Sequence, residues 1–413
     1  MGGGRLGAGS PRPYIPDPPP ITLFNPMPTA AEIYWVFLHL GVTAYGGLAM
    51  IEPIRRRVVD DKKCLGQEEF FDGLALCQVL PGATVVQLVT NVGQRLRGPV
   101  GALARALGFI LPAFLLMLGL SWLYVRYGGL SPVKALSHGL NAVVIALLLQ
   151  ALWRLGKGVF RHWLDLLVGG MALLALWLKV NYLAVFFGAG FLSLALSAGE
   201  NRADNPPPLA SFGRVSAWRE MRALMIALAI CAGALGVLWS VSPLLARMAG
   251  IMLKVGVISF GGGYVMIPVL QWDVVDHLKW LTLRQFLDGI LLGFVTPGPL
   301  IILAAFVGYV LNGFTGAAVA TAFIFLPPIL IIVALTPYYH RVKEARWMRP
   351  LIQGIPAALM GMLALVTVQM GEAAITGWKT FALMTGAAAA LMVFDINLLM
   401  VIAAAAALSL VMF

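Results

Sequence analysis

The stretch "VGVISFGGGYVMIPV", residues 255–269, places three consecutive glycines inside a run of apolar residues. The stretch "LGVTAYGGLAMIEPI", residues 40–54, carries the same pattern earlier in the chain. At a spacing of 215 residues, the shared positions are Gly41, Gly46, Gly47 and Pro53 in the first stretch and Gly256, Gly261, Gly262 and Pro268 in the second. A glycine break that recurs at one spacing indicates an internal repeat.

The repeat continues beyond these glycines. "FFDGLALCQVLPGA" at 70–83 matches "FLDGILLGFVTPGP" at 286–299 with a spacing of 216 residues. Further matches at 215 are Gly93, Gly98, Gly101, Pro112 and Gly139 with Gly308, Gly313, Gly316, Pro327 and Gly354. We therefore expect a first repeat over 30–198 and a second over 245–413. A polar linker plus a connecting helix (199–244) joins them, and a disordered Gly/Pro-rich tail (1–29) precedes them.

The composition predicts an all-α polytopic membrane protein. Of 413 residues, 60% are hydrophobic and 11% are charged, and the mean hydropathy is +0.88. Because a bilayer-spanning helix needs about 20 apolar residues, the chain offers about 12–13 transmembrane helices. The segments lie near 30–50, 70–94, 99–125, 134–153, 162–178, 181–198, 221–241, 246–270, 284–311, 314–336, 350–371, 378–394 and 396–413. With six crossings per half, the helix at 221–241 would invert the second repeat, as in many secondary transporters.

The glycine and Pro-Gly breaks are the candidate substrate site. Irregular backbone at membrane depth is tolerated where it is buried in protein or lines a cavity, and broken helices expose N–H groups that suit an oxyanion. Close packing of helices through small residues is the alternative, which we favour for Gly93, Gly98 and Gly101. The expected substrate-binding residues are Gly46, Gly47, Gln78, Pro81, Gly82, Thr84, Gln87, Asn91, Lys254, Gly261, Gly262, Gly263, Thr296, Pro297, Gly298 and Pro299.

Ionisable residues in the apolar segments are candidates for coupling or gating, because such groups are costly in lipid. They are His39, Asp72, Arg95, Arg105 and Asp288. His39 and Lys254 each stand seven residues, or about two helical turns, before a glycine break. Three alternatives stay open: Arg105 reaches the headgroups, Arg95 is solvated in a loop, and the recurring aspartates cap their helices. Neutral polar residues are concentrated in the first half.

Other features narrow the function. The formal net charge of +11 is typical of cytoplasmic loops and of a preference for anions, so no nucleic-acid partner is expected. Three scattered cysteines form no metal or disulfide motif, and no metal site or cofactor is expected. The five histidines form no catalytic pair with a carboxylate, which argues against an enzyme. The chain also lacks the G-x-x-x-x-G-K-[ST] motif of ATP-driven transport.

Both halves resemble the repeated signatures of the chromate ion transporter family. The segments that carry this resemblance are "AYGGLAMIEPIRRRVV", "LCQVLPGATVVQLVTNVGQRLRGPVGALARALGFILPAF", "FGGGYVMIPVLQ" and "GFVTPGPLIILAAFVGYVLNGFTGAAVATAFIFLP". The chain is similar to the long, two-domain members. It departs from the family pattern at two places. Gly-Ala-Thr at 82–84 stands where the first PGP would be expected, and Tyr45 stands where the second half has Phe260.

The resemblance implies export of chromate across the bacterial inner membrane, with resistance to chromate as the result and sulfate as the chemically similar substrate. A sulfate or other oxyanion importer or exchanger and an anion channel are the alternatives. Chromate and sulfate are both tetrahedral dianions, so a site built of N–H groups and a cation distinguishes them poorly. The expected partners are these anions and the lipid bilayer, and a homodimer is left open.

Overall fold

The computed structural model describes residues 30–43, 50–160, 162–197, 217–259, 263–336 and 348–413, and all regular secondary structure in these ranges is helical. Four of the described helices are long and apolar enough to cross a membrane. The protein is an all-α, multi-pass membrane protein. The tail over 1–29, most of the linker, and Gly46, Gly47, Gly261 and Gly262 lie outside the described residues.

The two repeats contain the same succession of elements. The first repeat has α1 (Ala30–Thr43), α2 (Ile51–Arg55), η2 (Arg56–Asp61), α3 (Gln67–Val79), α4 (Thr84–Tyr127), α5 (Ser131–Val159), α6 (Trp163–Trp177) and α7 (Tyr182–Ser197). After α8 (Ala217–Val241), the second repeat has α9 (Pro243–Ile258), α10 (Met266–Gln271), η3 (Trp272–His277), α11 (Leu283–Val295), η4 (Leu300–Ile302), α12 (Leu303–Leu335), α14 (Met348–Ala374), α15 (Trp378–Met392) and α16 (Leu398–Met412). Even the short π-helical segments η2 and η3 recur.

Each Pro-Gly break forms the tip of a helical hairpin. A Cβ atom added to Gly73 in α3 would meet the Asn91 side chain in α4, on the far side of the break at residues 80–83. In the second repeat, a Cβ atom on Gly289 would likewise meet Phe306. Segments 70–94 and 284–311, expected as single crossings, therefore fold back on themselves, because proline and glycine interrupt the helices at midpoint.

The long helices α4 and α12 contain a second reversal. Arg97 and Gly98 have non-helical dihedral angles, and so do Asn312 and Gly313. Gly98 and Gly313 have φ values of 62° and 59°, which glycine adopts without strain. Across the first turn, Gly93 lies against the backbone of Gly101, and the equivalent glycines of α12 pack in the same way. The expected role in close packing is confirmed for Gly93 and Gly101, whereas a Cβ atom on Gly98 would meet nothing within 4 Å and Gly98 instead forms the turn.

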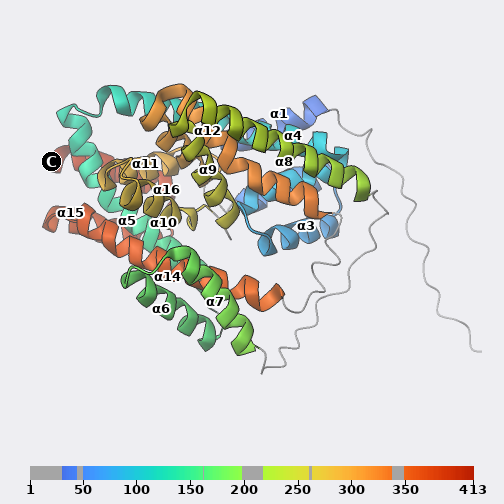
Figure 1. The fold of residues 1–413 in the computed structure, drawn as a ribbon. Coiled ribbons are helices and arrows are strands. Elements are labelled where there is room, and N and C mark those ends of the chain that lie inside the picture. The colour runs from blue at the N-terminus through green and yellow to red at the C-terminus, as the bar shows by residue number, and fades with distance from the viewer. Residues whose placement is uncertain (1–29, 44–49, 161, 198–216, 260–262, 337–347) are drawn as a thin grey trace, which may run out of the picture.

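The helices form two groups, and the repeats exchange helices between them (Figure 1). One group contains α1, α4, α9 and α12, with α4 packed along α12. In the other group, α14 of the second repeat packs on α6 and α7 of the first repeat. Conversely, α5 of the first repeat packs on α15 and α16 of the second. Neither repeat is therefore a separate body, and the hairpin tips lie where the two repeats meet.

Candidate functional site between the hairpin tips

Each hairpin tip contacts the first helix of the other repeat. The backbone N–H of Gly82 donates a hydrogen bond of 2.9 Å to the carbonyl of Ser259, directly after α9. At the second tip, a Cβ atom on Gly298 would lie 3.9 Å from the carbonyl of Gly41 in α1 and 2.7 Å from Cβ of Ala113 in α4. The breaks that are distant in sequence therefore gather at the interface of the repeats.

The backbone at both tips requires glycine. Gly82 has a φ of 126° and Gly298 a φ of 107°, in the region that L-residues rarely adopt. A Cβ atom at Gly82 would also lie 2.9 Å from Cβ of Pro328 in α12. Proline precedes each of these glycines and lacks an N–H donor. The Pro-Gly pairs thus set the shape of the tips and bring their backbones close to the other repeat.

The first tip carries buried polar side chains with free oxygen atoms. Thr84 begins α4, and Gln87 follows one turn later; both are at most 1% exposed. The Gln87 Nε2 donates to the Pro81 carbonyl at 2.6 Å, whereas Gln87 Oε1 and Thr84 Oγ1 have no hydrogen-bond partner among the described residues. Buried polar atoms are normally satisfied. Two buried oxygens without a partner among the described residues, beside a helix N-terminus without a side-chain cap, are groups that a polar ligand would satisfy.

Two other predicted residues of the first repeat lie differently. Asn91 is buried and bridges the repeats, since its Nδ2 donates to Thr336 at 3.2 Å and its Oδ1 accepts from Arg95 Nε at 3.0 Å. Arg95 thereby joins the interface network instead of standing in a solvated loop. Gln78, by contrast, is exposed on α3. Asn91 therefore has its hydrogen-bond partners in the protein, unlike Thr84 and Gln87.

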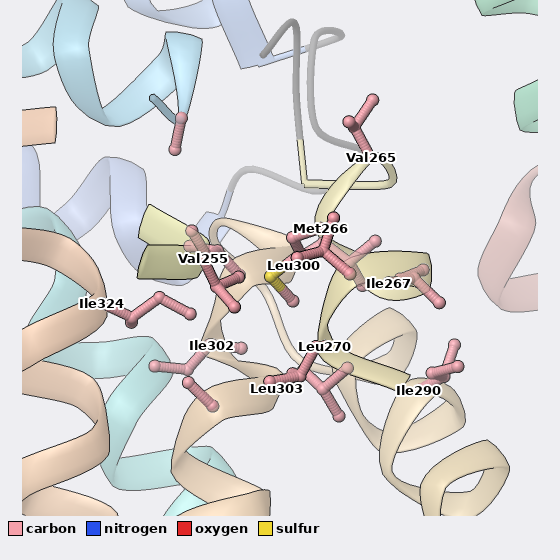
Figure 2. Packing of buried hydrophobic residues seen from close by; sticks show 14 of the residues in the cluster. Val255, Val265, Met266, Ile267, Leu270, Ile290, Leu300, Ile302, Leu303 and Ile324 are labelled. Atoms are coloured by element: carbon pink, nitrogen blue, oxygen red, sulfur yellow. The ribbon is translucent and has the colours of Figure 1, made fainter. Parts of the chain in front are cut away.

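The second tip has the same backbone and an apolar surface. Figure 2 shows Leu300, Ile302 and Leu303 within one cluster of buried hydrophobic side chains. Pro297, Gly298 and Pro299 are buried, and Thr296 Oγ1 donates to the Leu292 carbonyl of its own helix at 2.8 Å. A Cβ atom on Gly263 would lie 2.8 Å from Cβ of Leu300. The second tip is therefore lined by apolar side chains, whereas the polar side chains Thr84 and Gln87 lie at the first tip.

Lys254 is held in an ion pair. Its Nζ lies 2.7 Å from Asp273 Oδ1, and its side chain is 32% exposed while that of Asp273 is 7% exposed. The Tyr182 hydroxyl donates to the other oxygen of Asp273 at 3.4 Å, and Lys254 lies over the Tyr182 ring at 5.4 Å. Because Asp273 balances this charge, the ammonium is not a free cation for a substrate in this conformation. Its predicted contact with substrate stays a prediction.

Asp288 forms a buried polar cluster that joins the repeats. Its carboxylate accepts hydrogen bonds from Tyr124 in α4 at 2.9 Å and from Asn141 in α5 at 3.0 Å. The side chain is 5% exposed and makes no ion pair within the described part of the chain. Its repeat partner Asp72 is partly exposed on α3. Neither aspartate caps its helix, because the caps of α3 and α11 are Gly66 and Thr282.

A cavity lined by both basic and acidic side chains lies in the first repeat. It has a volume of ≈ 360 Å³ and lies between α1 and the α2–η2 segment. The residues that line it are His39, Leu40, Glu52, Pro53, Arg56, Arg57 and Asp61. The carboxylate of Glu52 pairs with Arg55 at 2.7 Å, which lowers its pKa, and Asp61 pairs with Arg57 at 3.3 Å. The lining thus contains two arginines and two carboxylates, and Arg56 makes no ion pair among the described residues.

Arg105 does not reach the headgroups. It is 2% exposed on α4, and its guanidinium lies over the Phe37 ring at 4.8 Å. The expectation that the side chain extends to the membrane surface is wrong, because α1 covers it. A long, positively charged side chain in an apolar segment usually extends its charge to the membrane surface, and this is why the sequence favoured that position for Arg105.

Comparison with known proteins agrees with this architecture. A model of the family described as chromate transporter matches residues 31–194 and 246–410, one match in each repeat. The chain belongs to the chromate transporter family. A chromate transport protein of Pseudomonas aeruginosa is 33% identical over 83% of this chain and 81% of its own length. A second, of Cupriavidus metallidurans, is 30% identical over 96% of this chain and 98% of its own length. An uncharacterized transporter of Methanocaldococcus jannaschii is 31% identical over 86% and 87%.

No solved structure is significantly similar to the chain. The family supports transport of chromate across the membrane. The resemblance noted from the repeated motifs is thus confirmed, and so is the two-repeat architecture of the long members.

Sequence reasoning missed several polar residues that the fold brings together. Tyr124 and Asn141 contact Asp288 from 164 and 147 residues away, and no local pattern relates them. Asp273 lies 19 residues after Lys254. Lys254 lies in an apolar stretch close to a recurring break, and a charge in such a place indicates an acidic partner nearby.

Proposed function

We propose that the protein is a secondary transporter that exports chromate across the bacterial inner membrane and thereby confers resistance. We place the substrate between the two re-entrant hairpin tips. One observation carries this assignment: both tips contact the opposite repeat, and the first tip holds buried Thr84 and Gln87 oxygens without partners. Transporters with inverted repeats bind their substrates at such an interface near the bilayer midplane.

The first tip has the chemistry for an oxyanion. The first turn of α4 begins at Thr84 without a side-chain cap, so its N–H groups carry partial positive charge. The Thr84 hydroxyl adds a donor at the same place. N–H and hydroxyl donors fixed in a water-poor site bind a tetrahedral dianion such as chromate or sulfate. The Gln87 side chain holds the tip by its bond to Pro81 and orients it.

The membrane potential is sufficient to drive export. Moving one charge through 100 mV yields about 2.3 kcal/mol, so a dianion leaving an inside-negative cell yields about 4.6 kcal/mol. That free energy sustains about a thousandfold gradient, because a factor of ten corresponds to about 1.4 kcal/mol. The Walker motif of ATP-driven pumps does not occur in the sequence. A secondary mechanism needs no further energy source.

Asp288 is our candidate for coupling to protons. Its carboxylate belongs to α11 of the second repeat, whereas its two hydrogen-bond donors belong to α4 and α5 of the first. A change in its protonation would alter bonds that join the repeats. A buried carboxylate without an ion pair is a costly group in a membrane protein, which favours a functional role. Asp72 is the weaker candidate because it is partly exposed.

The test is uptake of labelled chromate into inside-out vesicles with an imposed potential, with excess sulfate as competitor. We expect potential-driven accumulation that sulfate suppresses. Vesicles without the protein give the background. Accumulation only under the opposite potential would contradict export and favour an importer, whereas flux too fast to saturate would favour a channel. No accumulation under any gradient would contradict the proposed function.

A further inference from the structure

Arg105 is a buried guanidinium with no anionic partner among the described residues. Its side chain is 2% exposed, and neither Nε nor Nη1 has a hydrogen-bond partner in the described part of the chain. The Phe37 ring contributes a cation–π contact at 4.8 Å. The one ionisable group described as interacting with it electrostatically is the thiol of Cys64, in the loop after η2. A buried charge without a carboxylate or hydrogen bonds is expensive, so a bound anion is the natural complement.

Arg105 lies on the face of α4 that leads to the second hairpin tip. The backbone of Phe109, one turn later, contacts Gly41 in α1, and Ala113, another turn later, contacts Gly298. At 1.5 Å per residue, the eight residues from Arg105 to Ala113 span about 12 Å along the helix axis. Arg105 is therefore near the tip without belonging to it.

The same elements connect Arg105 with the cavity at His39 and Arg56. Leu40 lines the cavity and lies one helical turn after Phe37, which covers Arg105. The cavity also contains residues of η2, and the loop that follows η2 contributes Cys64 beside Arg105. Arg56, which makes no ion pair among the described residues, would attract an anion to this cavity, and Phe37 and Cys64 connect the cavity with Arg105.

We propose that Arg105 is the cation of a second oxyanion site, between the cavity at His39 and Arg56 and the hairpin tips. This inference rests on the proposed function and adds a position on the path of the substrate. A guanidinium presents parallel N–H donors that match two oxygens of a tetrahedral oxyanion. Because the repeat partner of Arg105 is the buried Ala320, only the first repeat has this site.

A purely structural role for Arg105 makes the opposite prediction. If the contact with Phe37 stabilises the fold, replacement of Arg105 by an apolar residue lowers stability with or without an anion. If Arg105 instead binds an anion, replacement of Arg105 by an apolar residue removes a buried positive charge that nothing balances in the anion-free protein. The anion-free protein is then at least as stable as the wild type, and only the part of its response to the oxyanion that Arg105 supplies is lost.

The experiment measures the thermal unfolding of the purified full chain in detergent, with increasing sulfate and with chloride at matched ionic strength. A ligand that binds the folded state raises the apparent Tm. We expect sulfate to stabilise the wild type beyond chloride. In Arg105→Met we expect the part of this effect that Arg105 supplies to be lost, while the part from the hairpin tip stays, with no loss of Tm in chloride. Arg126→Met is the matched control, because Arg126 is an exposed arginine of the same helix, and it should respond to sulfate as the wild type does.

A second variant guards against misfolding. Arg105→Lys keeps the charge and loses the paired donors, so we expect a sulfate midpoint at least about tenfold higher at unchanged Tm in chloride. An unchanged sulfate response in either variant, or a lower Tm of Arg105→Met in chloride, would overturn the inference. If the variants transport chromate normally in vesicles, the Arg105 site fails while the proposed function stands. If the wild type itself transports no chromate, the proposed function fails first.

Discussion

The two hairpins share a backbone and differ in chemistry. Both have a Pro-Gly tip with a glycine at positive φ, and both contact the first helix of the other repeat. Where the first repeat has Thr84, Gln87 and Asn91 after its tip, the second has Leu300, Leu303 and Phe306 among buried apolar side chains. The first repeat also holds Arg105, against Ala320 in the second.

This difference shows which features of the hairpin both repeats keep and which only one repeat needs. Shape at the tips depends on glycine and proline, and both copies need it because each tip fits against the other repeat. Polar recognition needs only one set of donors, so the second copy is free to pack an apolar core. The charged residues of the second repeat are instead tied to protein partners: Lys254 to Asp273, and Asp288 to Tyr124 and Asn141.

The largest effect should come from the feature that the repeats share. We expect Gly82→Ala and Gly298→Ala each to reduce chromate flux by about 100-fold, because the new Cβ displaces a tip by a fraction of an ångström or more. Gly119→Ala is the control, since a Cβ there meets nothing within 4 Å. Flux and expression in vesicles are measured together. Loss in only one of the two tip variants would break the equivalence of the hairpins.

The Lys254–Asp273 pair tests whether the second repeat uses its cation for structure. We expect Lys254→Met to lower the free energy of unfolding by about 2 kcal/mol, less than a fully buried pair because Lys254 is partly exposed. The double variant with Asp273→Leu should recover most of that loss, as measured by thermal unfolding. A stable Lys254→Met protein without chromate flux would instead assign Lys254 to the substrate.

Thr84 tests polar recognition in the first tip. Thr84→Val keeps the shape and removes a hydroxyl without a protein partner, so we expect unchanged Tm and about a tenfold higher KM for chromate, the cost of one hydrogen bond to a charged group. Thr90→Val is the matched control, because the Thr90 hydroxyl bonds to Val86 in its own helix. If both variants have the wild-type KM, the substrate does not contact this hydroxyl.

The smallest effect on potential-driven flux is expected at Asp72 and Asp288, the aspartates that occupy equivalent positions in the two repeats. We expect Asp288→Asn to change flux without a pH gradient only a few-fold and to remove the response to an imposed pH gradient, because the buried carboxylate can no longer exchange a proton. Asp72→Asn should retain that response. A wild-type pH response in Asp288→Asn would exclude this carboxylate as the coupling group.

The sequence predicted the repeated architecture because glycine and proline leave a direct signature at fixed spacing. The family and the glycine packing in α4 and α12 follow from that signature, and the helical membrane fold follows from the composition. The hairpins could not be predicted in this way. The segment "FFDGLALCQVLPGATVVQLVTNVGQ" over 70–94 has the length of a membrane crossing, and hydropathy does not show where a chain reverses.

The residues that contact the buried charged groups also could not be predicted from the sequence. Asp288 contacts residues of α4 and α5 that are distant in sequence, and the burial of Arg105 depends on α1 lying over it. Such contacts depend on the exchange of helices between repeats, which no periodicity within one segment reveals.

Membrane sidedness of the first hairpin tests the account most directly. Glu68 and Arg97, exposed at either end of the hairpin, are each replaced by cysteine in a background without Cys64, Cys77 and Cys231. An impermeant maleimide is then added to right-side-out and inside-out vesicles. A re-entrant hairpin predicts that both cysteines react from the same side. Reaction from opposite sides would mean that 70–94 crosses the bilayer, and would contradict the assignment of Pro81-Gly82 to a tip at the substrate site.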